Sequence, residues 1–419
     1  MNPLHPLKYL TVDLFLYDLG EGLGQDTEQL QQNRHNFWQR IYPNSLTETK
    51  LADLQAEERS FSNYIELLGT QRYEPLKPPL DGFYYPVKLN DTYALQIDCS
   101  GQKNDPGWEQ LSQAERLQQL KQIILDHRRN TPGEMGETWL IWGQLTDAAQ
   151  TAEDLAKTCY TEIQIVERPN WQRDLKGQGN IQDATLFQLE QKDLIPDGQN
   201  QTHQIFICLF PHDRTKEEII ELIGRLYRHF IQLFHYRNKI LWVYEQSRQL
   251  KIALKKSSSP VQKLVNLLPQ RLATSLDLNQ LQQDLATALQ VFHDYANRLG
   301  DLQEQCATIE INTRNYQKRI EAIAQQNPQS DLEFLKAFGE FGQTKLDALK
   351  TEYQTFSVGL KPLENFITTI QGIIEIEKTK NERNLNTTVA IASVGISTAS
   401  LAATTFTFEQ AKGIVAAIS

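Results

Sequence analysis

Apolar and polar residues alternate with period two along residues 8–19, where Leu10, Val12, Leu14 and Leu16 share one face. Such alternation predicts a strand that buries one of its faces. Further strands are predicted over residues 83–88, 92–98, 137–145, 185–189 and 203–210. The last of these runs is apolar on both faces, so we expect it inside a sheet.

Stretches with helical periodicity separate these strands. Helices are predicted over residues 27–42, 47–68, 112–129 and 152–159. Ser112 and Glu115 have the spacing of a capping box, which marks the start of the third helix. Alternating strands and helices favour a layered α/β domain that ends near Pro211.

After Pro211 the pattern changes to long helical repeats. A helix is predicted from Asp213 to a polar break at residues 255–260. Over residues 276–326 apolar residues are spaced by three and four in turn, which is typical of a coiled-coil seam. The seam comprises Leu278, Leu281, Leu285, Ala288, Phe292, Tyr295, Leu299, Leu302, Cys306, Ile309, Thr313, Tyr316, Ile320 and Ile323. At about 1.5 Å per residue this helix would be on the order of 75 Å long.

The sequence Asn-Pro-Gln-Ser at residues 327–330 predicts a short turn, because its proline ends one helix and either Ser330 or Asp331 can cap the next. A second apolar seam then runs through residues 346–374. Two long helices joined by a short turn form an antiparallel hairpin. We expect Gly359 and Pro362 to weaken or kink the second helix.

An uncharged stretch of twenty-five residues, Asn384–Phe408, follows this helix in a chain of which 22% is charged. Thirteen of its residues are apolar, nine are Ser or Thr, two are Asn and one is Gly. A helix of this length can cross a hydrocarbon core of about 30 Å. Because Lys378, Lys380 and Arg383 precede it, the positive-inside rule predicts that the N-terminal part of the chain lies in the cytoplasm.

Two faces of this predicted transmembrane helix differ in character. Gly395, Ala399 and Ala403 recur every four residues and would let helices pack closely. The other face suits a polar lumen with an apolar constriction, and it carries Asn384, Thr388, Ile391, Thr398 and Thr405. The alternative interpretation is a buried Ala/Ser-rich helix in a soluble bundle.

Net charge and cysteine spacing argue against nucleic acid as a partner and against zinc or redox sites. The net charge of −10 does not favour nucleic acid as a partner. Four cysteines stand far apart, so no zinc or redox spacing is present, and buried reduced thiols are favoured over a nucleophile. The N-terminal residues 1–15 lack the pattern of a signal peptide. We expect no cofactor, no metal site and no catalytic residues.

Four basic residues define a candidate anion-binding face: Arg225, Arg228, His235 and Lys239. They lie near one face of a helix and could bind an anionic ligand or the acidic residues of another subunit. A solvated basic face is the alternative.

Residues 20–24 read Gly-Glu-Gly-Leu-Gly, which favours a turn over a phosphate loop because the spacing is not GxGxxG. Asp13 and Asp18 on the first strand form a candidate carboxylate pair.

Residues 373–406 read IIEIEKTKNERNLNTTVAIASVGISTASLAATTF, a charged helix that runs directly into the uncharged segment. This junction resembles the CorA-type divalent-cation channels. The resemblance implies that the stalk helix continues into a pore-lining helix, that five subunits surround the pore, and that Asn384, Thr388, Ile391 and Thr398 line it.

Two features depart from the CorA pattern. The Gly-Met-Asn signature has no counterpart, since residues 405–413 read TFTFEQAKG, and a second span is missing. Magnesium selectivity is therefore not implied. CorA-like proteins without the signature occur beside antiviral signalling systems, which implies a nucleotide-like ligand and a role in antiviral defence.

The sequence thus predicts an α+β fold. Its parts are a layered α/β domain at 1–211, a long antiparallel coiled-coil stalk at 212–383, a transmembrane helix at 384–408 and a short tail at 409–419. We expect a non-enzymatic, homo-oligomeric CorA-like protein of the inner or plasma membrane, with membrane lipid as a partner and a pore controlled by its cytoplasmic domain. The alternatives are a soluble coiled-coil scaffold and an α-helical pore-forming toxin-like protein.

Overall fold

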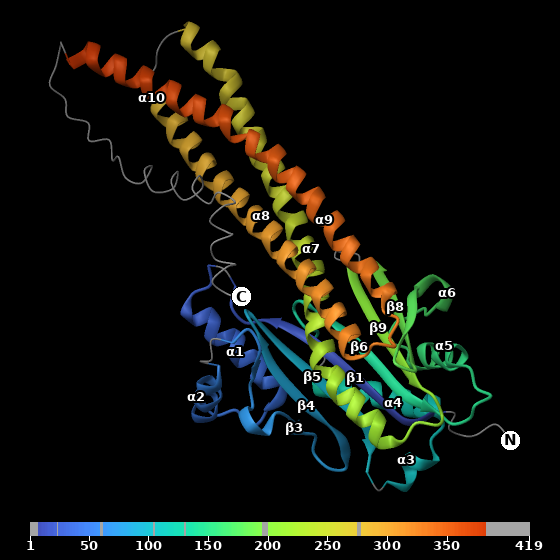
Figure 1. Ribbon diagram of the computed structural model, residues 1–419. Coiled ribbons are helices and arrows are strands. Elements are labelled where there is room, and N and C mark those ends of the chain that lie inside the picture. The colour runs from blue at the N-terminus through green and yellow to red at the C-terminus, as the bar shows by residue number, and fades with distance from the viewer. Residues whose placement is uncertain are drawn as a thin grey trace. The chain divides into compact units, whose positions relative to one another are not determined.

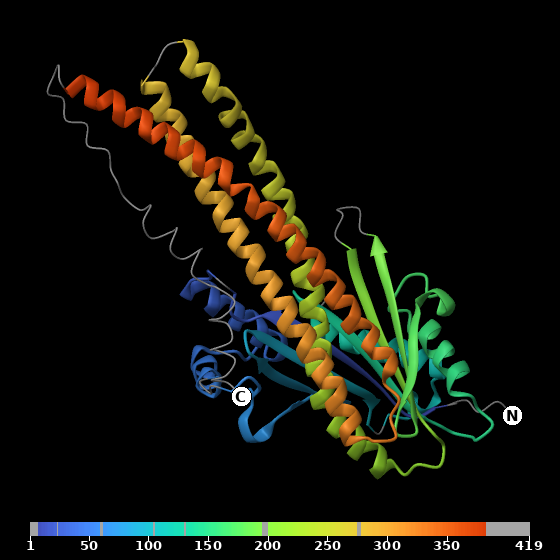
Figure 2. The same cartoon turned by 45° about the horizontal axis from the view of Figure 1, so that its top comes forward.

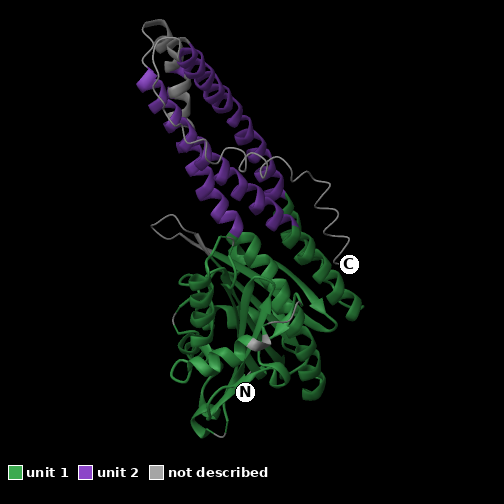
Figure 3. Cartoon of the chain, turned by 90° about the vertical axis from the view of Figure 1, so that its left-hand side faces the viewer, with its two compact units in different colours: residues 1–242, 311–343 green, residues 243–310, 344–419 purple. Residues whose placement is uncertain are grey.

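A computed structural model describes residues 7–22, 24–58, 62–103, 105–129, 131–194, 200–274 and 278–382. The chain forms two compact units (Figure 3). Unit 1 contains residues 1–242 and 311–343, and unit 2 contains residues 243–310 and 344–419. The fold is α+β, as predicted, with a sheet in the N-terminal half and long helices in the C-terminal half (Figure 1).

The described strands of unit 1 form one nine-stranded sheet in the order β2-β4-β5-β1-β6-β9-β8-β7, with β3 beside β4. The strands are β1 (Leu7–Leu19), β2 (Ile65–Glu66), β3 (Glu74–Pro75), β4 (Leu80–Leu89), β5 (Thr92–Gln102), β6 (Gly136–Leu145), β7 (Leu175–Ile181), β8 (Ala184–Leu194) and β9 (Asn200–Phe210). All neighbours pair antiparallel except β6 and β9, which pair in parallel. Strand β9, predicted from residues 203–210, lies inside the sheet as expected.

One face of the sheet buries an apolar core. Val12, Leu14 and Leu16 of β1 lie on it, which confirms the period-two prediction. Three helices cover this face: α1 (Thr27–Ile41), α4 (Gln113–Arg128) and α5 (Ala152–Ile163). Ser112 and Glu115 cap α4 reciprocally, as predicted. The shorter helices are α2 (Glu48–Glu57), η1 (Gly69–Gln71), α3 (Pro106–Gln110) and α6 (Trp171–Asp174).

The opposite face of the sheet packs against the part of α7 (Lys216–Thr274) that belongs to unit 1, up to residue 242 (Figure 2). Phe234 of α7 contacts Phe15 and Phe206, with ring centroids 5.2 and 4.8 Å away. Helices therefore cover both faces, so unit 1 has three layers. Since part of α7 and the turn at residues 327–331 belong to unit 1, this unit extends beyond the α/β region expected to end at residue 211.

The remaining long helices are α8 (Leu278–Gln326), α9 (Glu333–Val358) and α10 (Leu360–Glu382). Helices α8 and α9 pair antiparallel, as predicted: Tyr316 Oη donates to the Leu335 carbonyl at 3.1 Å, and Tyr295 Oη donates to the Phe356 carbonyl at 2.9 Å. In unit 2, α8 and α10 share an apolar core of Leu281, Ala288, Leu363, Phe366, Ile367, Ile370 and Ile374. Gly359 separates α9 from α10, at the expected weak point.

Two predicted boundaries are wrong. The helix predicted over residues 47–68 ends at Glu57, and β2 follows at Ile65. The break predicted at residues 255–260 is absent, because α7 continues to Thr274. Packing overrides the weak helix propensity there: Leu254 is fully buried, and Arg298 of α8 donates to Ser257 Oγ.

Within the described part of the chain, no helix combines the length and apolar character needed to cross a membrane. The segment Asn384–Phe408 lies outside the described residues. The predicted pore-lining and helix-packing positions therefore lie there too: Asn384, Thr388, Ile391, Thr398, Thr405, Gly395, Ala399 and Ala403.

Candidate functional site

The four residues of the candidate basic face do not form one site. Arg225 is exposed beside Glu221, and the Arg228 guanidinium lies 4.6 Å from the centroid of the Tyr64 ring. His235 and Lys239 are buried because α7 packs on the sheet there. The helical spacing predicted that the four residues share one face over about four turns, but the sheet covers only the second pair.

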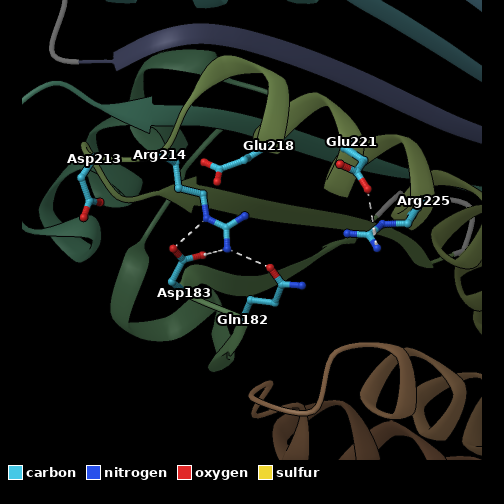
Figure 4. Close-up of a pocket in the computed structure, with 7 residues that line it drawn as sticks. All are labelled: Gln182, Asp183, Asp213, Arg214, Glu218, Glu221 and Arg225. Atoms are coloured by element: carbon cyan, nitrogen blue, oxygen red, sulfur yellow. Dashed lines mark hydrogen bonds and ion pairs between the residues drawn. The ribbon is translucent and has the colours of Figure 1, made fainter.

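A surface hollow of about 460 Å³ adjoins the start of α7 (Figure 4). Its lining comprises Gln182, Asp183, Asp213, Arg214, Glu218, Glu221 and Arg225. Arg214 Nε donates to Asp183 Oδ2 at 2.7 Å, and Arg214 Nη2 donates to Gln182 Oε1 at 2.8 Å. Four carboxylates outnumber two guanidinium groups, so the hollow does not provide the anion site that the basic face suggested.

In the glycine loop at residues 20–24, the backbone N–H groups of residues 20–22 are bonded to other groups of the protein. The backbone N–H groups of Gly20 and Glu21 both donate to the Asp91 carbonyl, at 2.8 and 2.9 Å. The Gly22 N–H donates to Gln25 Oε1 at 2.7 Å. Because these donors are already bonded, the loop is a turn rather than a phosphate cradle, as the spacing favoured.

Asp13 and Asp18 do not form the carboxylate pair considered from the sequence. Asp18 accepts two hydrogen bonds from Arg40, at 2.8 and 3.0 Å. An odd and an even position of one strand point to opposite faces of the sheet. Asp13 instead lies directly opposite Asp98 in the register of β1 and β5.

Polar side chains fill much of the interface between α7 and the sheet. Asn238 Nδ2 donates to Thr138 Oγ1 at 3.0 Å, and Arg237 forms an ion pair with Glu190. Tyr17 Oη of β1 donates to the Ile231 carbonyl at 2.9 Å. Helix α7 is therefore positioned by directional bonds as well as by its aromatic contacts.

His235 and Lys239 lie deep in the same interface. Lys239 forms an ion pair with Asp91 at the turn between β4 and β5. His235 is only 1% exposed, and neither of its ring nitrogens has a hydrogen-bond partner among the described residues. Burial lowers the pKa of His235 well below 6.5, and the nearby Lys239 charge lowers it further.

The cysteines are buried and unpaired, as the sequence favoured. Burial raises the pKa values of Cys99 and Cys208 to about 12 and that of Cys306 to about 11. These thiols are therefore unsuited to act as nucleophiles near neutral pH. Over the part of the chain that the structure describes, no group of three His, Cys, Asp or Glu side chains is placed to hold a metal ion.

The polar interface between α7 and the sheet is thus the candidate site, and the sequence indicated only some of its members. His235 and Lys239 were among the candidates, whereas Arg237 and Asn238 were not. Period-3.6 arguments place these residues on a helix, but they do not show which side chains of the sheet face them. Comparisons with protein-family models, curated proteins and solved structures find no match to this chain.

Proposed function

We propose that the chain is a homo-oligomeric membrane protein whose segment Asn384–Phe408 forms or gates a pore under the control of the sheet domain. One observation carries this proposal: α10 remains helical to Glu382, two positions before the uncharged segment begins. A helix that reaches this point can continue into a membrane span without a turn.

The charge pattern at this junction supports a membrane boundary. Lys378, Lys380 and Arg383 come immediately before twenty-five uncharged residues. Basic residues at the end of a span favour the cytoplasmic side of a bilayer. The sheet domain and the described long helices would then lie in the cytoplasm.

Composition of the segment supports assembly rather than simple anchoring. Nine Ser or Thr side chains make a single span costly to insert, while helices packed through Gly395, Ala399 and Ala403 can satisfy these hydroxyls across their contacts. The CorA resemblance implies five copies. Asn384, Thr388, Ile391, Thr398 and Thr405 would then face the lumen.

The test compares two Val→Lys variants of the full-length chain in dye-loaded liposomes. Val394→Lys puts a charge in the middle of the segment, which costs about 2.5–3.5 kcal/mol at the centre of a span. We expect this variant to lose most of the dye release that the unchanged protein causes. Val358→Lys is the matched control, because Val358 is 71% exposed and a lysine there costs little.

A second pair of variants examines the two faces. Gly395→Leu keeps the segment apolar but removes the close approach of helices, so it should weaken oligomers seen by cross-linking. Ile391→Ser should change conductance while leaving the oligomer intact. Equal dye release from the unchanged protein and Val394→Lys would contradict the pore.

The soluble scaffold remains a second candidate, and the packing of unit 2 favours it. Helices α8 and α10 bury their apolar seams against each other, so the described helices need no outside partner to form a core. Fractionation separates the two functions. A scaffold would purify from cytosol without detergent, whereas the proposed pore would require detergent.

A further inference from the structure

Two aspartates meet beneath α7 in the middle of unit 1. Asp13 of β1 and Asp98 of β5 are direct cross-strand partners, and their exposed fractions are 0% and 5%. Both face α7, where Tyr227 lies over them. Two buried carboxyl groups side by side are costly unless a cation or a proton compensates them.

When both carboxyl groups are ionised, one of the two contacts between Tyr227 and the aspartates has no hydrogen. Tyr227 Oη lies 3.1 Å from Asp13 Oδ2 and 2.9 Å from Asp98 Oδ2. Trp142 Nε1 donates to the same Oη at 2.9 Å. A phenol has one hydrogen, so it can serve only one carboxylate, and the other contact needs a proton on a carboxyl group.

The remaining hydrogen bond of the pair does not remove this need. Gln96 Nε2 donates to Asp13 Oδ1 at 2.9 Å, which serves the other oxygen of Asp13. Burial and the two aspartates raise the pKa of Tyr227 well above 10, so the phenol keeps its hydrogen through the neutral range. The extra proton must therefore reside on Asp13 or Asp98.

The charged groups around the pair provide no compensation either. On β4, Asp81 adds further negative charge, and its partner is Lys103, with 2.9 Å between Nζ and Oδ1. On α7, Arg228 lies over the Tyr64 ring and Arg225 beside Glu221. From β6, the partner of Asp13 is the apolar Leu140, and the neutral indole of Trp142 bonds to Tyr227. On the strands themselves, Thr11 and Ser100 bond to each other.

We propose that Asp13 and Asp98 hold a single shared proton at neutral pH and that the docking of α7 on the sheet depends on it. With the proton present, every contact of Tyr227 has a hydrogen. Without it, two negative charges face each other below α7 and Tyr227 can bond to only one. Loss of the proton thus loosens the segment of α7 that lies in unit 1.

The expected pH dependence follows from the direction of the shifts. Burial raises the pKa of Asp98 to about 6, against the hydrogen bonds from Tyr227 and Asp13, which lower it. Burial and the Asp98 charge raise the pKa of Asp13 well above its usual range. Groups with raised folded pKa values stabilise the fold when protonated, and this contribution is lost as pH rises through those values. The contribution of Asp98 is therefore lost as pH rises to about 6, and that of the proton still held at neutral pH is lost at higher pH, as pH rises through the raised pKa of Asp13. Docking should keep weakening above pH 6 until this last proton leaves.

Hydrogen–deuterium exchange of the full-length chain tests whether the docking of α7 depends on the shared proton. After correction for intrinsic exchange rates, residues 220–242 should lose at least tenfold protection between pH 6 and pH 9. D98N and D13N replace one acid by a neutral amide, so their protection should change less than twofold. D81N is the matched control and should keep the response of the unchanged protein, because Asp81 is partly exposed and ion-paired.

Infrared spectroscopy of the unchanged protein detects a protonated carboxyl group directly, so this measurement does not require the variants to fold. The unchanged protein at pH 7.5 should show a carboxylic-acid C=O band that disappears at higher pH. D13N and D98N should lack this band, whereas Tyr227→Phe should keep it and reduce only the protection of α7.

Two outcomes would overturn the proposal: absence of the acid band from the unchanged protein, or the same pH response of exchange in D98N, D13N and D81N. The inference concerns unit 1 alone. A negative result for dye release would leave it standing, and its own failure would leave the membrane proposal untouched.

Discussion

The turn between α8 and α9 packs on β7, and at Gly179 it leaves no room for a side chain. Next to it, the Asn180 N–H donates to the Asp331 carbonyl and the Asp331 N–H donates to the Asn180 carbonyl, both at 2.9 Å. A Cβ atom at Gly179 would lie 2.2 Å from the Asp331 carbonyl oxygen and 2.8 Å from the Phe334 ring. Gly179→Ala is therefore expected to push the turn off the strand.

The cost follows from the contacts that would be lost. Each of the two backbone hydrogen bonds contributes about 0.5–1.5 kcal/mol. The displaced Phe334 ring adds part of the roughly 1.5–3 kcal/mol that a fully buried aromatic side chain contributes. We expect Gly179→Ala to lower the free energy of unfolding of unit 1 by about 2–4 kcal/mol.

Gly224→Ala is the matched control within the same unit. Gly224 lies in α7, and a Cβ atom there meets nothing within 4 Å. Alanine should stabilise that helix by about 0.5–1 kcal/mol. Urea unfolding gives both free energies, and hydrogen exchange at Asn180 and Asp331 shows whether the strand-to-turn pairing has opened. Equal stability of the two variants, with the pairing intact, would refute the argument.

Three further predictions concern single side chains of unit 1. Ser112→Ala should cost about 0.5–2 kcal/mol in urea unfolding because it removes the N-cap of α4, whereas Ser112→Asp should keep most of that stability. Arg40→Lys should cost about 2 kcal/mol or more in thermal unfolding, because lysine cannot reproduce the two bonds to Asp18 and those to three backbone carbonyls; a loss below about 0.5 kcal/mol would contradict this role. The lowered pKa of His235 means that the unfolded chain takes up a proton first as pH falls below about 6.5, so stability should decrease from pH 7.5 to pH 5. His235→Leu should reduce that decrease, which denaturation midpoints at the two pH values would show.

The apolar face of the sheet could be predicted from the sequence, because the alternation that marks it lies within a single strand. Leu10, Val12, Leu14 and Leu16 repeat every second residue, and this period alone assigns them to one buried face. The same period places Asp13 on the other face. Its partner Asp98 could not be inferred, because the match depends on the register between two strands more than eighty residues apart.

Strand β7, in contrast, could not be predicted from its own sequence. Its sequence, Leu-Lys-Gly-Gln-Gly-Asn-Ile, lacks the alternation of apolar residues that predicts a strand. The structure explains the glycines: Phe334 packs on Gly177 and Gly179, where side chains would collide with its ring. Since Phe334 follows some 150 residues later in the chain, no local pattern could have indicated this strand.

In the long helices, the spacing of apolar residues predicted which positions are buried better than it predicted where each helix ends. Most seam positions of α8 are buried, and even the polar Thr313 is only 3% exposed. The extension of α7 through residues 255–260 was missed because Ser and Pro weaken helices on average, while Leu254 and Ser257 are held by tertiary contacts that the sequence does not show. Local propensity is a weak guide wherever packing decides.

The two faces of the sheet suit different tasks, and this difference connects the candidate site with the proposed control of a pore. The face under α1, α4 and α5 is mainly an apolar core, with ion pairs such as Arg40–Asp18 at its edge. The face under α7 depends on directional bonds and on one proton. A shift of one pKa unit changes the relative free energy of the two protonation states by about 1.4 kcal/mol. This energy acts on the contacts of α7 with the sheet and not on the apolar core of the other face. The sheet would therefore keep its fold while the part of α7 that lies in unit 1 responds to the proton.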